Sequence, residues 1–251
     1  SQNQQLIAKS YVNVKNWVNH MVQNTLFLAS QQPLAEFSRE NKITFLQSEF
    51  SSFIRYHKEL MQIRFIGKDG YEKVRVNREG DNIVVVAQNA LQNKSKRDYF
   101  IESNKLKKES IFISEFDLNV EFGRIEVPIK PTIRIATPVF DSQENRIGVI
   151  VINFNVNYLL EQLTGINKVE NQKLWLANQK GDWLVPPDGA RSFGRLLGFD
   201  RDVVDTSFPG LAKQLLSSQK TDGAWEEAGY LMEVKQIDLL KQGALVNVRS
   251  G

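Results

Sequence analysis

Apolar residues recur at steps of three and four along the first part of the chain, which is the spacing of a helix face. Residues 4–30 carry such a stripe without an interrupting Gly or Pro, so they predict one long amphipathic helix. A second stripe, with steps of 3, 4, 3, 4 and 3, runs from Ile43 to Leu60 and predicts another helix. Pro33 lies between the stripes and ends or redirects the first helix.

After these helices the pattern changes to strand-like runs. Residues 61–66 and 71–76 alternate on either side of Asp69-Gly70, and this dipeptide between alternating apolar residues is a strong hairpin signal. Residues 88–108 are polar and rich in lysine, so we expect a loop that contains a short helix.

Three further runs form the stretch around which the rest of the chain is organised. Ile111–Phe116, Ile133–Phe140 and Ile147–Phe154 are rich in β-branched and aromatic residues, as strands of a buried sheet require. The last two flank the polar loop 141–146, which predicts an antiparallel hairpin. Five strands with separate helices predict an α+β fold.

The last hundred residues repeat this plan on a smaller scale. We expect a short helix over 156–163, a hairpin formed by 174–177 and 183–185, and a helix around 210–219. Two closing strands are expected at Gly229–Ile237 and Ala244–Arg249. The second half therefore reads as a reduced copy of the first.

Composition limits the possible functions. The 251 residues are 41% hydrophobic and 24% charged, which is typical of a soluble globular protein with room for two modest domains. The net charge of +3 gives no reason to expect a nucleic-acid partner. The sequence begins within a helical stripe and without Met, so we expect it to be part of a longer protein. No apolar run approaches the roughly 20 residues of a membrane-spanning helix.

Catalytic and metal-binding motifs are not found in the sequence. The chain has no cysteine, which excludes disulfides, thiolate metal sites and cysteine nucleophiles. Its two histidines, His20 and His57, lie far apart in predicted helices, so we expect packed or surface side chains, no metal and no cofactor. There is no phosphate loop and no nucleophile elbow, and we expect no enzyme activity in this chain.

Arg134 is the first candidate for ligand binding. It lies inside an apolar strand, where a charge needs a partner or a ligand, and its planar guanidinium suits a carboxylate. Alternatively, it pairs with Glu115 or Asp117, or it faces solvent. Ser114 could supply a hydroxyl to the same pocket, or it could be an ordinary small strand residue.

Further candidates flank the predicted strands. Arg97, Tyr99 and Phe100 could cover a ligand with one cation and two aromatic walls, or they could be a surface loop anchored by its aromatic rings. Thr137 and Asp141 are weaker candidates, because Asp141 is also well placed to begin the hairpin turn.

With these residues laid out, the chain resembles the double-Cache sensor domains of bacterial membrane histidine kinases. These are extracytoplasmic domains, also called tandem PDC and PAS-like. The long N-terminal helix, the hairpin FIGKDGYEKVRV, the motif RDYF and the three-strand stretch up to Phe154 carry the resemblance. It implies two PAS-like domains, each an antiparallel sheet with flanking helices. The implied division is 1–60 for a helical stalk, 61–155 for a membrane-distal ligand-binding domain and 156–251 for a smaller membrane-proximal domain.

The resemblance also implies partners and a location. Transmembrane helices would precede Ser1 and follow Gly251, the chain would be periplasmic, and the receptor would work as a homodimer. A small molecule, possibly anionic, would bind the distal domain and control a kinase domain outside this chain. Amino-acid-binding members carry an Arg and a Trp-Tyr pair in the region of Arg97, but here Tyr99 and Phe100 match only in part.

Two alternatives remain open at this point. The output could belong to a chemoreceptor or a cyclic-dinucleotide enzyme. The chain could instead be a periplasmic protein-interaction module without a small-molecule ligand, using an exposed second hairpin that bears Trp175 and Trp183.

Overall fold

The computed structural model describes residues 2–31, 42–121, 123–166, 173–215, 217, 222–237 and 243–250. Contacts along the chain group it into two compact units. Unit 2 comprises residues 19–114 and 132–155, and unit 1 comprises residues 1–18, 115–131 and 156–251. The domain boundaries predicted after residues 60 and 155 remain a prediction.

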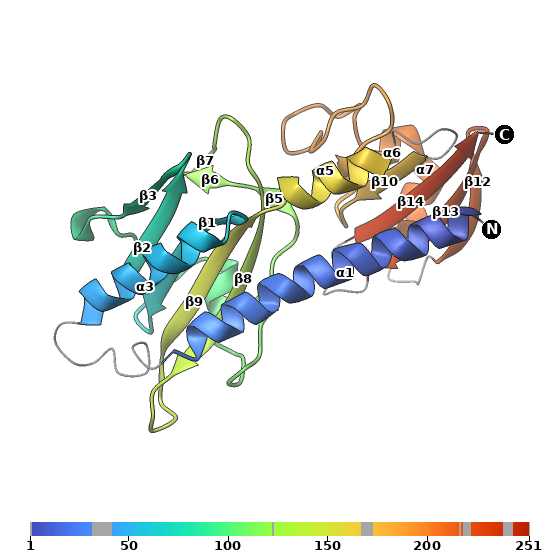
Figure 1. Ribbon diagram of the computed structural model, residues 1–251. Coiled ribbons are helices and arrows are strands. Elements are labelled where there is room, and N and C mark those ends of the chain that lie inside the picture. Colours follow the sequence, from blue (N-terminus) through green and yellow to red (C-terminus); the bar gives the residue numbers. More distant parts are fainter. Residues whose placement is uncertain are drawn as a thin grey trace. The chain divides into compact units, whose positions relative to one another are not determined.

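The long N-terminal helix is confirmed as α1 (Gln2–Ala29; Figure 1). Its residues up to Val18 belong to unit 1 and the following ones to unit 2. Its buried positions follow one another at steps of three and four residues, as the apolar stripe predicts. They are Ile7, Ser10, Val14, Val18, Met21, Thr25 and Leu28. The second predicted helix is α3 (Lys42–Tyr56), which buries Leu46, Phe50 and Ile54.

Unit 2 is built on an antiparallel sheet, whose strands run from blue-green (β1–β3) to yellow-green (β9) in Figure 1. Six of its strands follow the order β3-β2-β1-β9-β8-β4. Their bounds are β1 (Leu60–Gly67), β2 (Glu72–Glu79), β3 (Asn82–Val85), β4 (Phe112–Ile113), β8 (Pro131–Phe140) and β9 (Arg146–Asn155). The two-residue strand β5 (Asp117–Leu118) falls within the residues assigned to unit 1.

Both predicted hairpins of this sheet are confirmed. β1 and β2 pair across the turn at Asp69-Gly70, and Gly70 has the positive φ of 82° that favours glycine. β8 and β9 pair across the turn that begins at Asp141. The run predicted as Ile111–Phe116 forms only a two-residue strand, because β4 lies at the sheet edge and the chain leaves the ladder after Ser114.

Helices cover the two faces of this sheet. α3 packs on β1, β2 and β3, where the side chains of Ile63, Phe65, Val74 and Val76 are completely or almost completely buried. The segment between β3 and β4 contains the short helices η1 (Gln88–Ala90) and α4 (Asp98–Ser103). The latter packs against β4 and β9.

Unit 1 is organised around a smaller antiparallel sheet with the order β11-β10-β14-β13-β12. The predicted hairpin and closing strands are confirmed, whereas β12 was not predicted because its sequence is mixed and polar. The strands are β10 (Lys173–Ala177), β11 (Trp183–Val185), β12 (Gly223–Glu227), β13 (Tyr230–Ile237) and β14 (Gly243–Ser250). The other elements are β6 (Val120–Glu121), β7 (Arg124–Ile125), α5 (Asn157–Ile166), α6 (Val204–Ser207) and α7 (Pro209–Leu215).

The core of unit 1 contains both tryptophans of the second hairpin. Trp175 is 4% exposed and Trp183 is fully buried, and the Trp175 ring stacks on Phe208 with 5.4 Å between ring centroids. The expectation that these two rings form an exposed protein-binding surface is therefore wrong. Their indoles belong to the hydrophobic core, where burial of large aromatic surfaces stabilises the sheet.

Candidate functional site

The sheet of unit 2 has one apolar and one polar face, because side chains alternate along each strand. Residues opposite each other in antiparallel strands share a face of the sheet. The strand register therefore shows which residues belong to the polar face. Arg64 on β1 lies opposite Arg75 on β2 and Val151 on β9, and Arg134 on β8 lies opposite Asn153 on β9. All of these side chains are buried.

Arg64 is the centre of this polar face. Its guanidinium donates to the Tyr99 hydroxyl at 2.7 Å and to the side-chain carbonyl of Asn153 at 2.6 Å, and it lies 4.8 Å from the centre of the Tyr99 ring. The side chain is only 3% exposed. Among the described residues its polar partners are neutral, and its Nε has no hydrogen-bond acceptor. A buried cation with neutral partners is costly for the fold.

Arg75 and Glu72 form a buried ion pair beside it. The Arg75 guanidinium lies 3.2 Å from the Glu72 carboxylate, which also accepts a hydrogen bond from the backbone N–H of Gln92 at 3.0 Å. Arg75 Nε and the second carboxylate oxygen of Glu72 have no hydrogen-bond partner among the described residues. The pair is therefore only partly satisfied by the protein itself.

Lys94 adds a third cation. Burial is the largest cause that lowers the pKa of its ammonium from the ordinary 10.5, and Tyr99 and Glu72 oppose the shift without reversing it. The guanidinium groups of Arg64 and Arg75 lower this pKa further, because like charges disfavour the protonated form. The ammonium donates to the side chain of Gln92 at 2.7 Å.

We call Arg64, Glu72, Arg75, Lys94 and Tyr99 the arginine cluster. It holds three cations against one carboxylate. Two arginines directly opposite each other in adjacent strands repel, and this arrangement destabilises a sheet unless an anion compensates it. Guanidinium groups bind carboxylates and phosphates through paired N–H donors. The cluster is thus suited to bind a small anion.

The structure brings the predicted Arg97, Tyr99 and Phe100 to this face. They lie at the start of α4, where Tyr99 is 4% and Phe100 is 5% exposed. Their rings pack in one apolar cluster with Ile66, Ala136, Val149 and Val151. The Arg97 guanidinium lies 5.6 Å from the centre of the Tyr99 ring. The segment therefore covers the polar face with aromatic side chains.

Arg134 also lies at the polar face, on β8, and Ser114 lies beside it, directly after β4. Arg134 is 6% exposed, and its neighbour across the ladder, Asn153, is the residue that accepts from Arg64. The Ser114 hydroxyl accepts a hydrogen bond from the backbone N–H of Arg134 at 2.8 Å. The Ser114 hydroxyl therefore continues the pairing with β8 just beyond the end of β4.

The two remaining predicted residues are not brought to the arginine cluster. Thr137 lies opposite Ile150, on the other face of the sheet, and its hydroxyl donates to the carbonyl of Ser110 at 2.7 Å. Asp141 begins the β8–β9 turn, where its carboxylate accepts from the backbone N–H groups of Gln143 and Asn145. The bond from the Asn145 backbone is the largest cause that lowers the pKa of Asp141.

Sequence reasoning missed four residues of the arginine cluster, namely Arg64, Glu72, Arg75 and Lys94. A signal for the two arginines was present, since each is a charge inside an apolar strand, as Arg134 is. Counting outward from the Asp-Gly turn would have placed them opposite each other. Lys94 reaches the cluster only through the path of its loop, which no sequence pattern predicts.

A cavity of about 210 Å³ lies in unit 1 between α7 and β12, lined by Leu211, Gln214, Asp222, Trp225 and Val234 among others. Its one carboxylate, Asp222, is already paired with Lys235 at 2.5 Å. We therefore place the candidate site at the arginine cluster.

The family comparison assigns this fold to a class of protein, the extracellular sensor domain. In the part of the chain that the structure describes, the helices are too short or too polar to cross a bilayer. The family model of the bacterial histidine kinase sensor domain matches residues 1–248. The chain belongs to this family, which confirms the resemblance seen in the sequence. The family is one of sensor domains, not of catalytic domains, and the kinase activity of its members lies in other domains.

Solved structures share the fold. The extracellular domain of vpHK1S-Z8, described as a histidine kinase, is 22% identical with a TM-score of 0.75, over 99% of this chain and 88% of that chain. A domain from Vibrio parahaemolyticus, described as a sensory box/GGDEF family protein, has the same identity and TM-score over 99% and 92% of the two chains. No curated protein matches the sequence.

A chemoreceptor domain is also similar. The ligand-binding domain of the amino acid chemoreceptor PctC of Pseudomonas aeruginosa, in complex with GABA, is 12% identical with a TM-score of 0.65. The match covers 98% of this chain and 97% of that chain. At these identities the likeness shows the fold, a mixed α+β Cache-type sensor fold with a long N-terminal helix.

Proposed function

We propose that this chain is the periplasmic ligand-sensing domain of a transmembrane histidine kinase and that it binds a small anionic molecule at the arginine cluster. The ligand-binding sheet belongs to the membrane-distal domain of the sequence prediction, 61–155, and 156–251 forms the membrane-proximal domain. The receptor works as a homodimer, and occupancy of the site changes the arrangement of the helices that lead to the membrane.

One observation supports the ligand class above all others. Arg64 is a buried cation whose partners, Tyr99 and Asn153, are neutral, and it lies directly opposite a second buried arginine. A protein that needed only stability would gain by replacing such a side chain with an apolar one. A bound carboxylate would accept from the guanidinium groups and offset their repulsion.

The same observation explains how binding could produce a signal. A ligand shifts a conformational equilibrium only by its differential affinity for two arrangements. An anion at the cluster is bound best by the arrangement in which both arginines point at it, so occupancy favours that arrangement of β1 and β2. The similar domain of PctC is in complex with GABA, a molecule that carries a carboxylate, and this is compatible with an anionic ligand here.

The test is a thermal-shift screen of the chain against dicarboxylates, amino acids, polyamines and neutral sugars. A ligand at about 100 times its dissociation constant stabilises the folded state by roughly 2.7 kcal/mol, which raises the melting temperature measurably. We expect hits among carboxylates. Hits confined to polyamines or neutral sugars would refute the anionic ligand.

The hit is then titrated calorimetrically into Arg64→Gln. Truncating one partner of a buried charge pair costs about 2–5 kcal/mol, so the dissociation constant should rise roughly 30-fold or more. The matched control is Arg124→Gln, because Arg124 is an exposed arginine in unit 1. Equal affinity of Arg64→Gln and the wild type would remove Arg64 from the site.

The comparison with the GGDEF family protein favours a second candidate for the output, a cyclic-dinucleotide enzyme. In that case the ligand chemistry at the arginine cluster stays the same, and only the attached catalytic domain differs. Sequencing the gene beyond residue 251 distinguishes a kinase from such an enzyme.

A further inference from the structure

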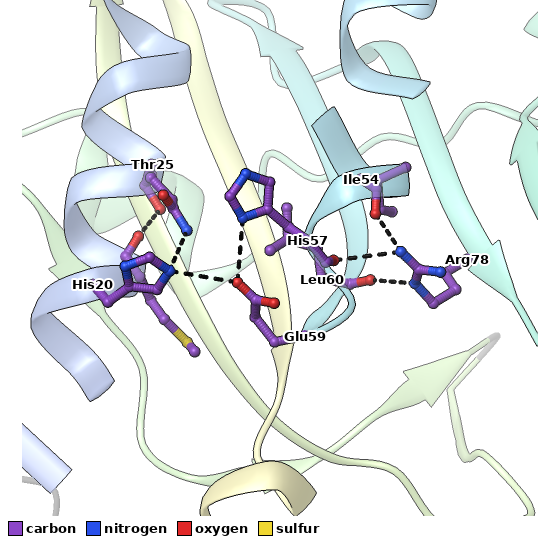
Figure 2. Close-up of polar contacts among 9 residues, drawn as sticks. His20, Thr25, Ile54, His57, Glu59, Leu60 and Arg78 are labelled. Atoms are coloured by element: carbon purple, nitrogen blue, oxygen red, sulfur yellow. Dashed lines mark hydrogen bonds and ion pairs between the residues drawn. The ribbon is translucent and has the colours of Figure 1, made fainter. Parts of the chain in front are cut away.

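Three potential metal ligands converge in unit 2, outside the arginine cluster. His20 lies on α1, His57 follows the last residue of α3, and Glu59 precedes β1. Figure 2 shows both imidazole rings turned toward the carboxylate of Glu59. Glu59 Oε1 lies 3.7 Å from His20 Nε2 and 3.4 Å from His57 Nδ1, and the three ligand atoms all lie within 4.8 Å of one another.

These distances are close to those of a metal site. Zinc binds imidazole nitrogen at about 2.0–2.1 Å and carboxylate oxygen at about 2.0–2.2 Å, so two ligands of a tetrahedral ion lie roughly 3.3 Å apart. The two distances from Glu59 Oε1 are already near this value. The His20 side chain, 61% exposed, has room to turn toward the other two ligands.

The local structure holds two of the ligands in place before any ion binds. The Arg78 guanidinium donates to the backbone carbonyls of Ile54, His57 and Leu60, which fixes the connector between α3 and β1 (Figure 2). The ring of His57 stacks on Phe53 with 4.3 Å between centroids. Neither contact uses His57 Nδ1, so this nitrogen remains directed at Glu59.

His20 is the ligand that must be released. The side-chain amide nitrogen of Asn24 lies 3.3 Å from His20 Nε2, the same atom that faces Glu59. A metal ion at Nε2 would displace this contact between exposed side chains, which is a small cost. Both rings bind a metal ion in the neutral form.

We propose that His20, His57 and Glu59 form a binding site for one divalent transition-metal ion, with zinc as the best-suited ion. Two imidazoles and one carboxylate are a donor set that zinc accepts while keeping a fourth position for water or another ligand. The bound ion fastens the second part of α1 to the connector that enters β1. This site opposes the sequence-based expectation of no metal, because the two histidines meet only through the packing of α1 beside α3.

The test uses the chain after removal of any affinity tag and of adventitious metal by a chelator. Titration with ZnCl₂ in a calorimeter should give one equivalent of saturable binding, and titration with Co²⁺ should give the visible absorption bands of a tetrahedral site. Because the chain has two histidines and no cysteine, both imidazole NMR signals should shift with the same single equivalent.

Variants identify the ligands. His20→Gln, His57→Gln and Glu59→Gln should each weaken zinc binding by at least about 100-fold, the upper end of the loss caused by removing an outer-shell partner. The control is Glu102→Gln, which neutralises an exposed carboxylate in a surface ion pair with Lys105 and should leave affinity unchanged. His20 is exposed, so His20→Gln is expected to fold even if His57→Gln does not. No saturable zinc binding by the wild type, or undiminished binding by His20→Gln, would overturn the proposal.

Discussion

Neutralising Glu72 should destabilise the ligand-free protein far more than neutralising Arg64, although the two residues lie in the same buried cluster. Glu72→Gln leaves the Arg75 guanidinium, 6% exposed, without its ion-pair partner at 3.2 Å. Breaking a buried ion pair in this way costs about 3–5 kcal/mol, because the remaining charge stays buried and uncompensated.

Arg64→Gln has two opposing effects. It removes the two hydrogen bonds from the guanidinium to Tyr99 and Asn153, each worth about 1.5–3 kcal/mol for a charged donor. It also removes a buried cation that lacks an acidic partner among the described residues, and the desolvation of such a cation costs several kcal/mol. The two contributions are of similar size, so the unfolding free energy should change by no more than about 1–2 kcal/mol.

The assay is chemical and thermal unfolding of both variants without ligand, followed by circular dichroism and calorimetry. For a chain of this size 1 kcal/mol corresponds to roughly 2–4 °C, so Glu72→Gln should lower the melting temperature by at least about 6 °C. Arg64→Gln should remain within a few degrees of the wild type. If Arg64→Gln were as unstable as Glu72→Gln, Arg64 would be a structural residue, and its assignment to ligand binding would lose its basis.

Two other predictions concern stability away from the arginine cluster. A Cβ added at Gly148 would overlap the backbone carbonyl of Ile66, so Gly148→Ala should cost about 1–3 kcal/mol. Gly165→Ala makes the same change in open space on α5 and should instead stabilise the protein by roughly 0.5–1 kcal/mol. Urea unfolding that changed the unfolding free energy of both variants in the same direction would contradict this account. Burial opposes ionisation of Glu227, but hydrogen bonds from backbone N–H groups in the first turn of α7 outweigh it and lower its pKa from the ordinary 4.5. A carboxylate whose pKa is lower in the folded than in the unfolded state stabilises the fold above its unfolded-state pKa, and this stability is lost as the pH falls through its folded-state pKa. Glu227→Gln should therefore make the unfolding free energy depend less on pH in that acidic range. An unchanged slope of unfolding free energy against pH would show that Glu227 does not contribute.

The hairpins and helices could be predicted from the sequence because each depends on neighbours along the chain. Asp69-Gly70 specifies a turn whatever lies around it, and β1 and β2 follow from the alternation on its two sides. The same local rules failed at β4 and β12. Both lie at sheet edges, where a strand has a neighbour on one side only. Polar residues there interrupt the alternation of apolar and polar positions that predicts a strand.

Only some residues of the candidate site were predicted from the sequence, and there is a physical reason why the others were missed. Tyr99 and Phe100 were found because an aromatic pair at the entrance of a sheet is a local signal. The turn at Asp69-Gly70 places Arg64 opposite Arg75, but it does not show that this face of the sheet is buried, and the two arginines were missed for this reason. Thr137 was chosen although strand alternation turns it to the other face, since a sequence gives the alternation but not which face is covered.

The sequence by itself determined the family, the long N-terminal helix, the hairpins and the α+β class, because these depend on periodicity and turn chemistry within a few residues. The tertiary structure decided which side chains meet. It buried the face of the sheet on which Arg64 lies opposite Arg75, and it brought His20 on α1 to His57, which follows α3. Convergence of this kind depends on long-range packing of elements, which the spacing of residues along a chain does not encode.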